Sequence, residues 1–264
     1  MNPWKPSFFP ASRRRLKLRE LLSVYRTLRR FFGHQHWWPG ETAFEIIVGA
    51  ILTQNTAWSN VERAIARLRA AGVLTPHALR KISTRRLARL IRPAGYFNVK
   101  AKRLKCFMDF LFQEYHGSLV RMFRESGESL RPKLLAVKGI GPETADSIFL
   151  YAGNKPFFVM DAYTRRVFSR HRIEVPQELL ASIQKRIPSV NPKRGRTQKS
   201  RRSFPSARIL ETMDYDAWQS LLTKALPQRI PLYNDFHAQI VAVGKHFCKS
   251  GRPLCQSCPL SRFF

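Results

Sequence analysis

A glycine-containing turn and a carboxylate that follows it are the residues of this sequence best suited to chemistry on a phosphate-bearing partner. Gly139-Ile140-Gly141 lies between two helical patterns, and Pro142 suits the first position of the second helix because its missing N–H would be unsatisfied there anyway. The two glycines permit a tight turn with outward backbone amides, which bind phosphate at a helix N-terminus. Asp161 follows at the start of a third helical pattern, where an aspartate taken alone is an ordinary N-cap. The segment therefore combines a phosphate contact with a carboxylate.

The charge of the whole chain indicates the same kind of partner. The 264 residues carry 47 Lys and Arg against 17 Asp and Glu, a net charge of +30, and the sequence pI is about 11.2. Values above about 9 are typical of nucleic-acid-binding proteins. A generally basic, ribosome-like protein is the alternative, because charge determines association and not fold. Hydrophobic residues make up 44% of the chain, which is enough for a core.

The sequence also bears on location. No apolar run approaches the ~20 residues that a membrane span needs, and the N-terminus lacks the apolar stretch of a secretory signal. We therefore expect an intracellular protein with no membrane partner. The segment before Glu20 contains arginine and no acid, so an organelle transit peptide and a basic DNA-facing arm both remain open.

Helical periodicity accounts for most of the chain. Residues 13–32 form an amphipathic helix, and residues 43–54 are almost wholly apolar after a Thr42 N-cap, as expected for the buried centre of a helical domain. Further helices are expected at 55–68 and 76–91. Because no segment shows the alternation of a strand, we predict an all-α fold of short helices.

The hairpin at 134–152 followed by Asp161 resembles the helix-hairpin-helix, Gly/Pro-Asp pattern of the endonuclease III superfamily of DNA glycosylases. The resemblance covers roughly residues 20–258. It implies two helical domains that flank a DNA-binding groove, and base excision repair as the function. It also implies that Lys138, Gly139 and Gly141 contact the DNA backbone. The domains would comprise residues 1–40 with 154–264, and residues 41–153.

Aromatic residues near a polar turn are typical of a pocket for a flipped base. The tryptophans could equally be core fillers. However, the chain looks most like the 3-methyladenine DNA glycosylases of the superfamily in three stretches, which are Trp-Trp-Pro, LTQNT and IRPAGYFNVKAKRL. That resemblance implies a base held by Trp38, Pro39 and Trp58, with Trp37 as the alternative to Trp38, and Gln54 inserted into the DNA at the vacated position. N3-methylated adenine is a cation, which gains about 1 to 2 kcal/mol between desolvated aromatic faces.

Two carboxylates determine the chemistry that the resemblance implies. Asp161 occupies the position of the catalytic aspartate, which stabilises an oxocarbenium-like sugar and orients or deprotonates the attacking water. Glu143 occupies the position that holds a lysine nucleophile in the bifunctional members. Because a carboxylate cannot form an imine, we predict a monofunctional glycosylase that leaves an abasic site. A lysine from elsewhere in the fold remains the alternative source of lyase activity.

The cysteine-bearing end, residues 248–264, matches only part of a cluster motif. Superfamily members with an iron–sulfur cluster use C-x6-C-x2-C-x5-C, in which Cys248, Cys255 and Cys258 match and the fourth position is Phe264. A [4Fe–4S] cluster needs four thiolates, so the ligand set is incomplete. A labile cluster with an outside ligand, a zinc site and a loop held by packing all remain open, and the chemistry itself needs no cofactor. We expect Cys106 to be a core thiol.

We also considered other functions. A glycosylase for oxidised pyrimidines or mismatched bases is disfavoured by Glu143 and by the Trp-Trp-Pro loop. A noncatalytic DNA-binding module is disfavoured by Asp161, because a carboxylate facing DNA costs affinity. The leading prediction is a monomeric enzyme that releases alkylated bases from double-stranded DNA. The basic segment 191–205 is interpreted either as a phosphate-tracking insertion or as an unstructured basic loop.

Overall fold

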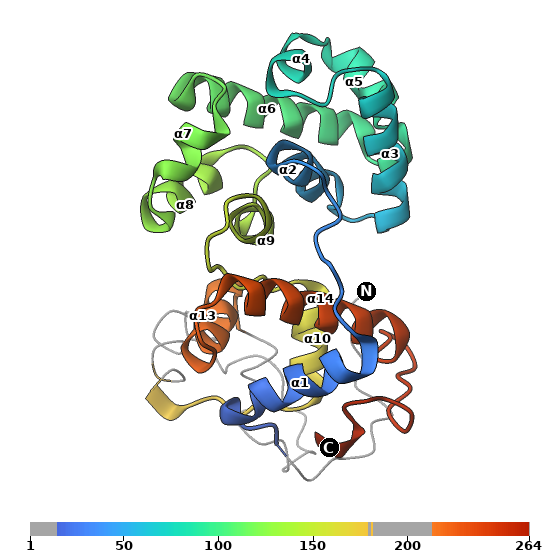
Figure 1. Cartoon of the computed structure of the whole chain (residues 1–264), viewed down its shortest axis with the longest axis vertical. Helices are drawn as coiled ribbons and strands as arrows, with labels where there is room; N and C mark the ends of the chain where they lie inside the picture. The colour runs from blue at the N-terminus through green and yellow to red at the C-terminus, as the bar shows by residue number, and fades with distance from the viewer. Residues whose placement is uncertain (1–14, 179–180, 182–212, 264) are drawn as a thin grey trace, which may run out of the picture. The chain divides into compact units, whose positions relative to one another are not determined.

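The computed structural model describes residues 15–178, 181 and 213–263. The basic segment 191–205, the expected N-terminal arm up to residue 14 and Phe264 lie outside these residues. Within them, every regular element is a helix, which confirms the all-α prediction (Figure 1). In this described part, no helix has the length and apolar character needed to cross a membrane.

The chain divides into two compact units. The terminal unit takes its described residues from Met1–Gln35, Met160–Gln228 and Asp235–Phe264, and the central unit consists of His36–Val159 and Arg229–Asn234. The domain boundaries expected from the sequence lay at residues 40/41 and 153/154, a few residues away from these. Because α14 runs through both units, the short 229–234 segment groups with the central one.

The central unit is built around α2 (Ala43–Leu52), in which nearly every residue is buried. Thr42 caps the helix by accepting a hydrogen bond from Glu45 N at 3.1 Å, so the predicted buried helix and its N-cap are confirmed. The other helices around it are α3 (Trp58–Ala70), α4 (Pro76–Lys81), α5 (Thr84–Leu90), η2 (Arg92–Ala94), α6 (Phe97–Tyr115), α7 (Leu119–Arg124), α8 (Gly127–Ala136), α9 (Pro142–Ser147) and the π-helical turn η3 (Ile148–Ala152).

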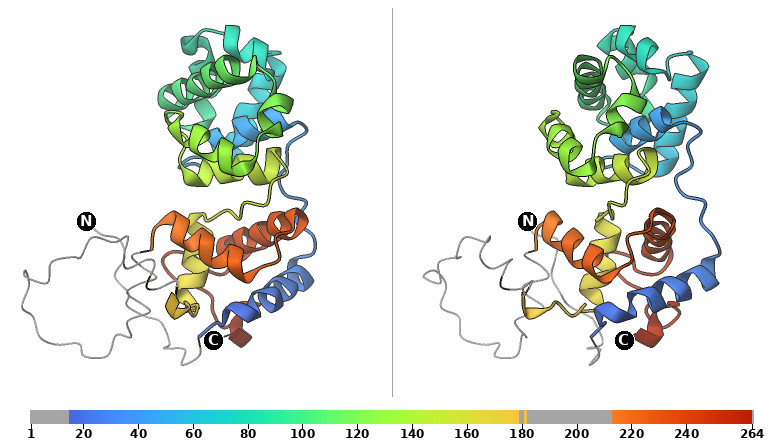
Figure 2. Two further views of the ribbon diagram at one scale, coloured as in Figure 1. Left: turned by 90° about the vertical axis from the view of Figure 1, so that its left-hand side faces the viewer. Right: turned by 60° about the vertical axis from the view of Figure 1, so that its left-hand side comes forward.

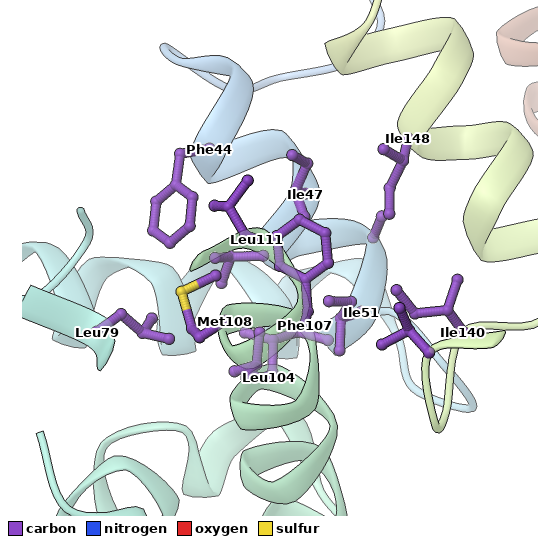
Figure 3. Close-up of a cluster of buried hydrophobic side chains, with 14 of the residues drawn as sticks. Phe44, Ile47, Ile51, Leu79, Leu104, Phe107, Met108, Leu111, Ile140 and Ile148 are labelled. Atoms are coloured by element: carbon purple, nitrogen blue, oxygen red, sulfur yellow. The ribbon is translucent and has the colours of Figure 1, made fainter. Parts of the chain in front are cut away.

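Apolar side chains of α2 and α6 form the middle of this core (Figure 3). Phe44, Ile47 and Ile51 of α2 lie against Phe107 and other residues of α6, and all are at most 5% exposed. Burying a side chain of this size contributes about 1.5 to 3 kcal/mol before conformational entropy is subtracted. The long apolar helix is therefore fixed in position by the packing of its neighbours.

Three expected helices differ from the observed ones. In the described residues, the helix expected at 13–32 begins as the 3-10 turn η1 (Leu18–Glu20) and continues as α1 (Leu21–Phe32). The helix expected at 76–91 is two helices, because Ser83 turns the chain and caps α5 by accepting a hydrogen bond from Arg86 N at 3.3 Å. The helix expected to start at Asn55 starts at Trp58, after Asn55 adopts a left-handed backbone with φ of 54°. A polar cap at Ser83 thus overrides the apolar periodicity within 76–91, and the left-handed backbone of Asn55 interrupts it at the start of 55–68.

The terminal unit consists of η1 (Leu18–Glu20), α1 (Leu21–Phe32), α10 (Ala162–Arg170), α13 (Tyr215–Ala225), α14 (Ile230–His246) and η4 (Ser261–Phe263). Helix α10 packs among α1, α13 and α14, as both views of Figure 2 show. Phe236 of α14 contacts Tyr25 of α1 and Phe168 of α10, at ring centroid distances of 5.4 and 6.4 Å. These aromatic contacts hold α10, and with it Asp161, against α14.

Candidate active site

Asp161 stands at the N-terminus of α10 and caps it. Its Oδ1 accepts hydrogen bonds from Thr164 N at 2.7 Å and from Thr164 Oγ1 at 2.8 Å. The N-cap that the sequence predicted is thus present, and its side chain remains 14% exposed. Because the cap uses Oδ1, the second oxygen, Oδ2, is left for another interaction.

That interaction is with His237, a residue that the sequence analysis did not single out. His237 Nε2 of α14 lies 3.5 Å from Asp161 Oδ2. Burial by itself would raise the pKa of Asp161, but the charge and hydrogen bond of His237 and the hydrogen bonds of Thr164 outweigh it and lower the pKa. Asp161 is therefore held as a carboxylate.

An aromatic cavity of about 290 Å³ lies in the central unit. It is lined by Trp38, Pro39, Gly40, Glu41, Glu45, Gly49, Trp58, Glu62, Ile65, Ala66 and Arg69. The structure thus brings together the three residues that the sequence analysis assigned to a base pocket, and Trp38 rather than Trp37 lines the cavity. The rings of Trp38 and Trp58 meet edge to face, with centroids 5.1 Å apart and planes at 88°. A base held between their faces requires one ring to rotate.

The position of Trp38 is fixed by its neighbours. A Cβ on Gly49 of α2 would stand 3.3 Å from Trp38 Nε1, so the helix presents a glycine where the indole packs. The ring of Tyr151 contacts Trp38 on another side, with centroids 5.1 Å apart. The buried helix α2 thus positions one wall of the cavity.

Three carboxylates line the cavity, and two of them contact one guanidinium. Arg69 NH2 lies 2.9 Å from both oxygens of Glu45 and 3.2 Å from Glu41 Oε1. Glu62 Oε1 accepts a hydrogen bond from Trp58 Nε1 at 2.7 Å. These glutamates were not expected at the site from the sequence, although each lies within seven positions of Trp38 or Trp58. The cavity is acidic in an otherwise basic protein.

The Gly-Ile-Gly turn joins α8 to α9. Ile140 is 4% exposed and points into the core of the central unit, while Gly141 is exposed (Figure 3). Gly139 has φ of +93°, and a Cβ there would collide with the side chain of Arg103. The exposed side chain of Lys138 adjoins the turn. The buried isoleucine therefore anchors a turn whose flanking residues remain accessible.

The two glycines of this turn are expected to respond differently to alanine. Gly139→Ala should destabilise the protein by at least about 2 kcal/mol, because it combines positive φ with a steric collision. Gly141 has φ of −95°, and its added Cβ meets no described atom within 4 Å. Gly141→Ala should therefore leave the melting temperature unchanged and weaken DNA binding by about tenfold, since a methyl group would keep a phosphate from the turn. Thermal unfolding and a DNA titration of both variants separate these effects.

Gln54 lies against the turn. Its Nε2 donates to Gly139 O at 3.0 Å and to Thr144 Oγ1 at 2.9 Å, and its Oε1 accepts from Arg103. Insertion of this side chain into DNA, the role implied by the resemblance, would require it to leave all three partners. That role stays a prediction.

Glu143 is exposed in the first turn of α9, at the position where a lysine nucleophile would stand. Lys100 is a lysine of the same unit with a perturbed amine, since burial and then the charge of Arg103 lower its pKa to about 8. However, Lys100 is 1% exposed and its Nζ donates to Leu52 O at 2.9 Å and to Ala94 O at 2.7 Å. This amine fixes the end of α2 and is not accessible to a sugar.

The cysteine loop is held by two arginines of α10. Arg166 donates to Cys248 O at 2.6 Å and to Gly244 O at 3.1 Å, and Arg170 donates to the carbonyls of Lys249 and Ser250. Arg170 NH1 also lies 3.2 Å from Cys248 Sγ. Arg170 thus places a positive charge beside the sulfur of Cys248.

A metal fits this loop poorly. Among the described residues, no three His, Cys, Asp or Glu side chains are grouped as ligands, and the described cysteines, including Cys106, are free thiols. Burial raises the pKa of the Cys258 thiol to about 11 and also raises the pKa of Cys255, which disfavours the thiolates that a metal needs. The arrangement of this loop therefore does not fit an iron–sulfur cluster held by Cys248, Cys255 and Cys258. The proposed chemistry uses no such cluster.

Known proteins share this helical arrangement. The model of the HhH-GPD superfamily of base excision DNA repair proteins matches residues 48–189. A Methanocaldococcus jannaschii protein, provisionally named a DNA repair glycosylase, is 37% identical over 94% of this chain and 96% of its own length. The H. pylori 3-methyladenine DNA glycosylase bound to 1,N6-ethenoadenine has a TM-score of 0.63 at 25% identity, covering 87% of this chain and 98% of that one. A non-covalent endonuclease III–DNA complex has a TM-score of 0.64 at 18% identity, covering 94% and 95%, and shows the fold alone.

Proposed function

Because the chain belongs to the HhH-GPD superfamily of base excision DNA repair proteins, we propose that it is a monofunctional DNA glycosylase that removes cationic alkylated purines from double-stranded DNA. The observation that carries this proposal is the acidic aromatic cavity formed by Trp38, Pro39 and Trp58 with Glu41, Glu45 and Glu62. Indole faces and carboxylates both attract a cation, and neither gives the same advantage to a neutral base.

The proposed reaction is hydrolysis of the N-glycosidic bond. The bond from C1′ to the purine nitrogen breaks, and its electron pair neutralises the positive charge of the departing base. Asp161 stabilises the oxocarbenium-like sugar and orients a water molecule, whose oxygen bonds to C1′ and whose proton passes to the carboxylate and then to solvent. The products are a free neutral base, an abasic site and one proton.

The reaction is proposed to stop at the abasic site. Glu143 offers a carboxylate in place of a lysine, and the buried Lys100 donates hydrogen bonds to the backbone carbonyls of Leu52 and Ala94. A duplex with one alkylated purine should therefore keep its strand intact until alkali is added. Strand cleavage by the protein alone, or a borohydride-trapped protein–DNA adduct, would contradict this part of the proposal.

DNA treated with a methylating agent provides the first test. The purified protein should release 3-methyladenine and related cationic purines, identified by chromatography of the ethanol-soluble fraction. Release of oxidised pyrimidines alone would favour the alternative endonuclease III-like specificity, and release of no base at all would favour a noncatalytic DNA-binding module.

Glu62 is expected to contribute to the preference for cations. Glu62→Gln keeps an oxygen that can accept from Trp58 Nε1 but removes a negative charge from the cavity, so release of a cationic purine should slow by about tenfold. Release of a neutral base such as 1,N6-ethenoadenine should change less than twofold. Single-turnover rates on two duplexes that differ only in the modified base give the ratio. Glu114→Gln, at an exposed carboxylate of α6 that does not line the cavity, is the matched control and should leave the ratio unchanged.

A further inference from the structure

His237 and Asp161 form a pair that joins two helices of the terminal unit. Asp161 begins α10, and His237 lies in the second turn of α14, 76 positions later in the sequence. The distance from His237 Nε2 to Asp161 Oδ2 is 3.5 Å, and the side chains are 6% and 14% exposed. A histidine–carboxylate contact with so little solvent is weakly screened, so its geometry matters more than that of a surface pair.

The two oxygens of Asp161 have different partners. Thr164 donates two hydrogen bonds to Oδ1, which an aspartate at any N-cap would use in the same way. In the described residues, Oδ2 faces a side chain of another helix, the imidazole of His237. N-capping explains the contacts of Oδ1, but it does not explain the contact between Oδ2 and His237.

Other titratable groups near Asp161 are directed elsewhere. Arg166 of α10 donates to the carbonyls of Gly244 and Cys248, and its guanidinium lies 4.9 Å from the centroid of the Tyr163 ring. Arg165, also on α10, is partly exposed. On α13, Tyr215 accepts a hydrogen bond from Met160 N at 3.2 Å.

The charged groups around His237 on α14 and α1 also have partners other than Asp161. Asp235, two positions before His237, lies 2.7 Å from Arg29 NH1 and accepts a hydrogen bond from Tyr25 at 2.9 Å. In the described part of the chain, His237 is therefore the side chain from another helix that pairs with Asp161.

We propose that His237 is a positioning residue for the glycosylase reaction: it orients Oδ2 of Asp161 and keeps this carboxylate ionised in a largely desolvated place. The inference rests on the proposed function, since it concerns the carboxylate of that reaction. Burial alone disfavours the charge that Asp161 needs in order to stabilise a cationic sugar. His237 compensates for that burial and fixes the direction of the lone pairs that meet the sugar or the water.

Two substitutions test this role in the full-length chain. His237→Gln keeps a hydrogen-bond donor of similar reach, and His237→Ala removes both donor and charge. Base release under single-turnover conditions should slow by about ten- to a hundredfold in His237→Ala, with partial recovery in His237→Gln, since small displacements of a reacting group cost up to about a hundredfold. DNA affinity should stay within about twofold of the wild type, because the histidine does not face the phosphates in this account.

The pH profile separates positioning from a merely structural role. In the wild type the pKa of Asp161 is lowered, so the rate should stay level as the pH falls well into the acid range. In both variants the burial of Asp161 is no longer offset by His237, its pKa rises, and the rate should begin to fall at a higher pH than in the wild type. Thermal unfolding of each variant shows whether it is folded under the assay conditions.

The outcomes are distinct. An acid limb that does not move in His237→Gln, with a rate within twofold of the wild type, overturns the inference. A parallel loss of rate and DNA affinity also overturns it, because that pattern belongs to a disrupted fold. A wild-type protein that releases no base from any duplex removes the proposed function itself, whatever the variants do.

Discussion

Replacing Asp161 with asparagine is expected to slow base release by about a thousandfold or more, since removing a group that stabilises transition-state charge costs at least that order in comparable active sites. Asparagine is nearly isosteric and is also a good N-cap, so the contacts to Thr164 should remain. DNA affinity should stay level or rise slightly, because one negative charge is removed from a protein that binds a polyanion. Single-turnover rates and a DNA titration measure the two quantities separately.

The chain provides a matched control for this substitution. Asp214 caps α13 in the same unit by accepting a hydrogen bond from Ala217 N at 2.8 Å. Asp214→Asn therefore makes the same chemical change at an N-cap that has no assigned part in the reaction, and it should release bases at the wild-type rate. More than a tenth of the wild-type rate in Asp161→Asn would contradict the role given to Asp161.

Loss of Asp146 is expected to have the largest effect on stability. Asp146 of α9 is fully buried, and Arg131 of α8 donates to its two oxygens at 2.9 and 3.3 Å. Asp146→Ala leaves a mostly buried guanidinium without its counter-charge, which costs about 3 to 5 kcal/mol in buried pairs of this kind. Because the pair joins the two helices of the hairpin, DNA affinity should fall as well.

A double substitution distinguishes the buried charge from the loss of packing. Arg131→Met with Asp146→Leu replaces both partners by apolar groups of similar size, and it should be more stable than Asp146→Ala alone. Urea unfolding of the three proteins gives the free energies. A cost below about 1 kcal/mol for Asp146→Ala would mean that the pair does not hold the hairpin together.

Features set by neighbouring residues could be predicted from the sequence. Thr42 and Asp161 were expected at N-caps, and both accept the hydrogen bonds of a cap. The apolar run of α2 was expected to be buried, and Ile140 between two glycines anchors the turn that they form. These features depend on caps, turns and periodicity, which are encoded within about ten residues.

Features set by distant residues could not be predicted. Glu45 follows the Thr42 cap in the sequence, and its partner, Arg69, lies on the next helix. Gln54, whose insertion into DNA stays a prediction, contacts Thr144 of the hairpin ninety positions away. His237 meets Asp161 only because α14 packs on α10, and no local pattern in the sequence indicates that contact. Side-chain partners of this kind follow from tertiary packing.

The central claim is that this protein hydrolyses the glycosidic bond of cationic alkylated purines, and one competition measures it most directly. Duplexes of one sequence carry 3-methyladenine, an oxidised pyrimidine or a G·T mismatch at the same position, and single-turnover release of each base is followed by mass spectrometry. We predict release of free 3-methyladenine at least about a hundredfold faster than of the other two bases, with the strand intact, which corresponds to the ~3 kcal/mol that charge and stacking together supply. Faster release of the oxidised pyrimidine or of the mismatched thymine would contradict the account.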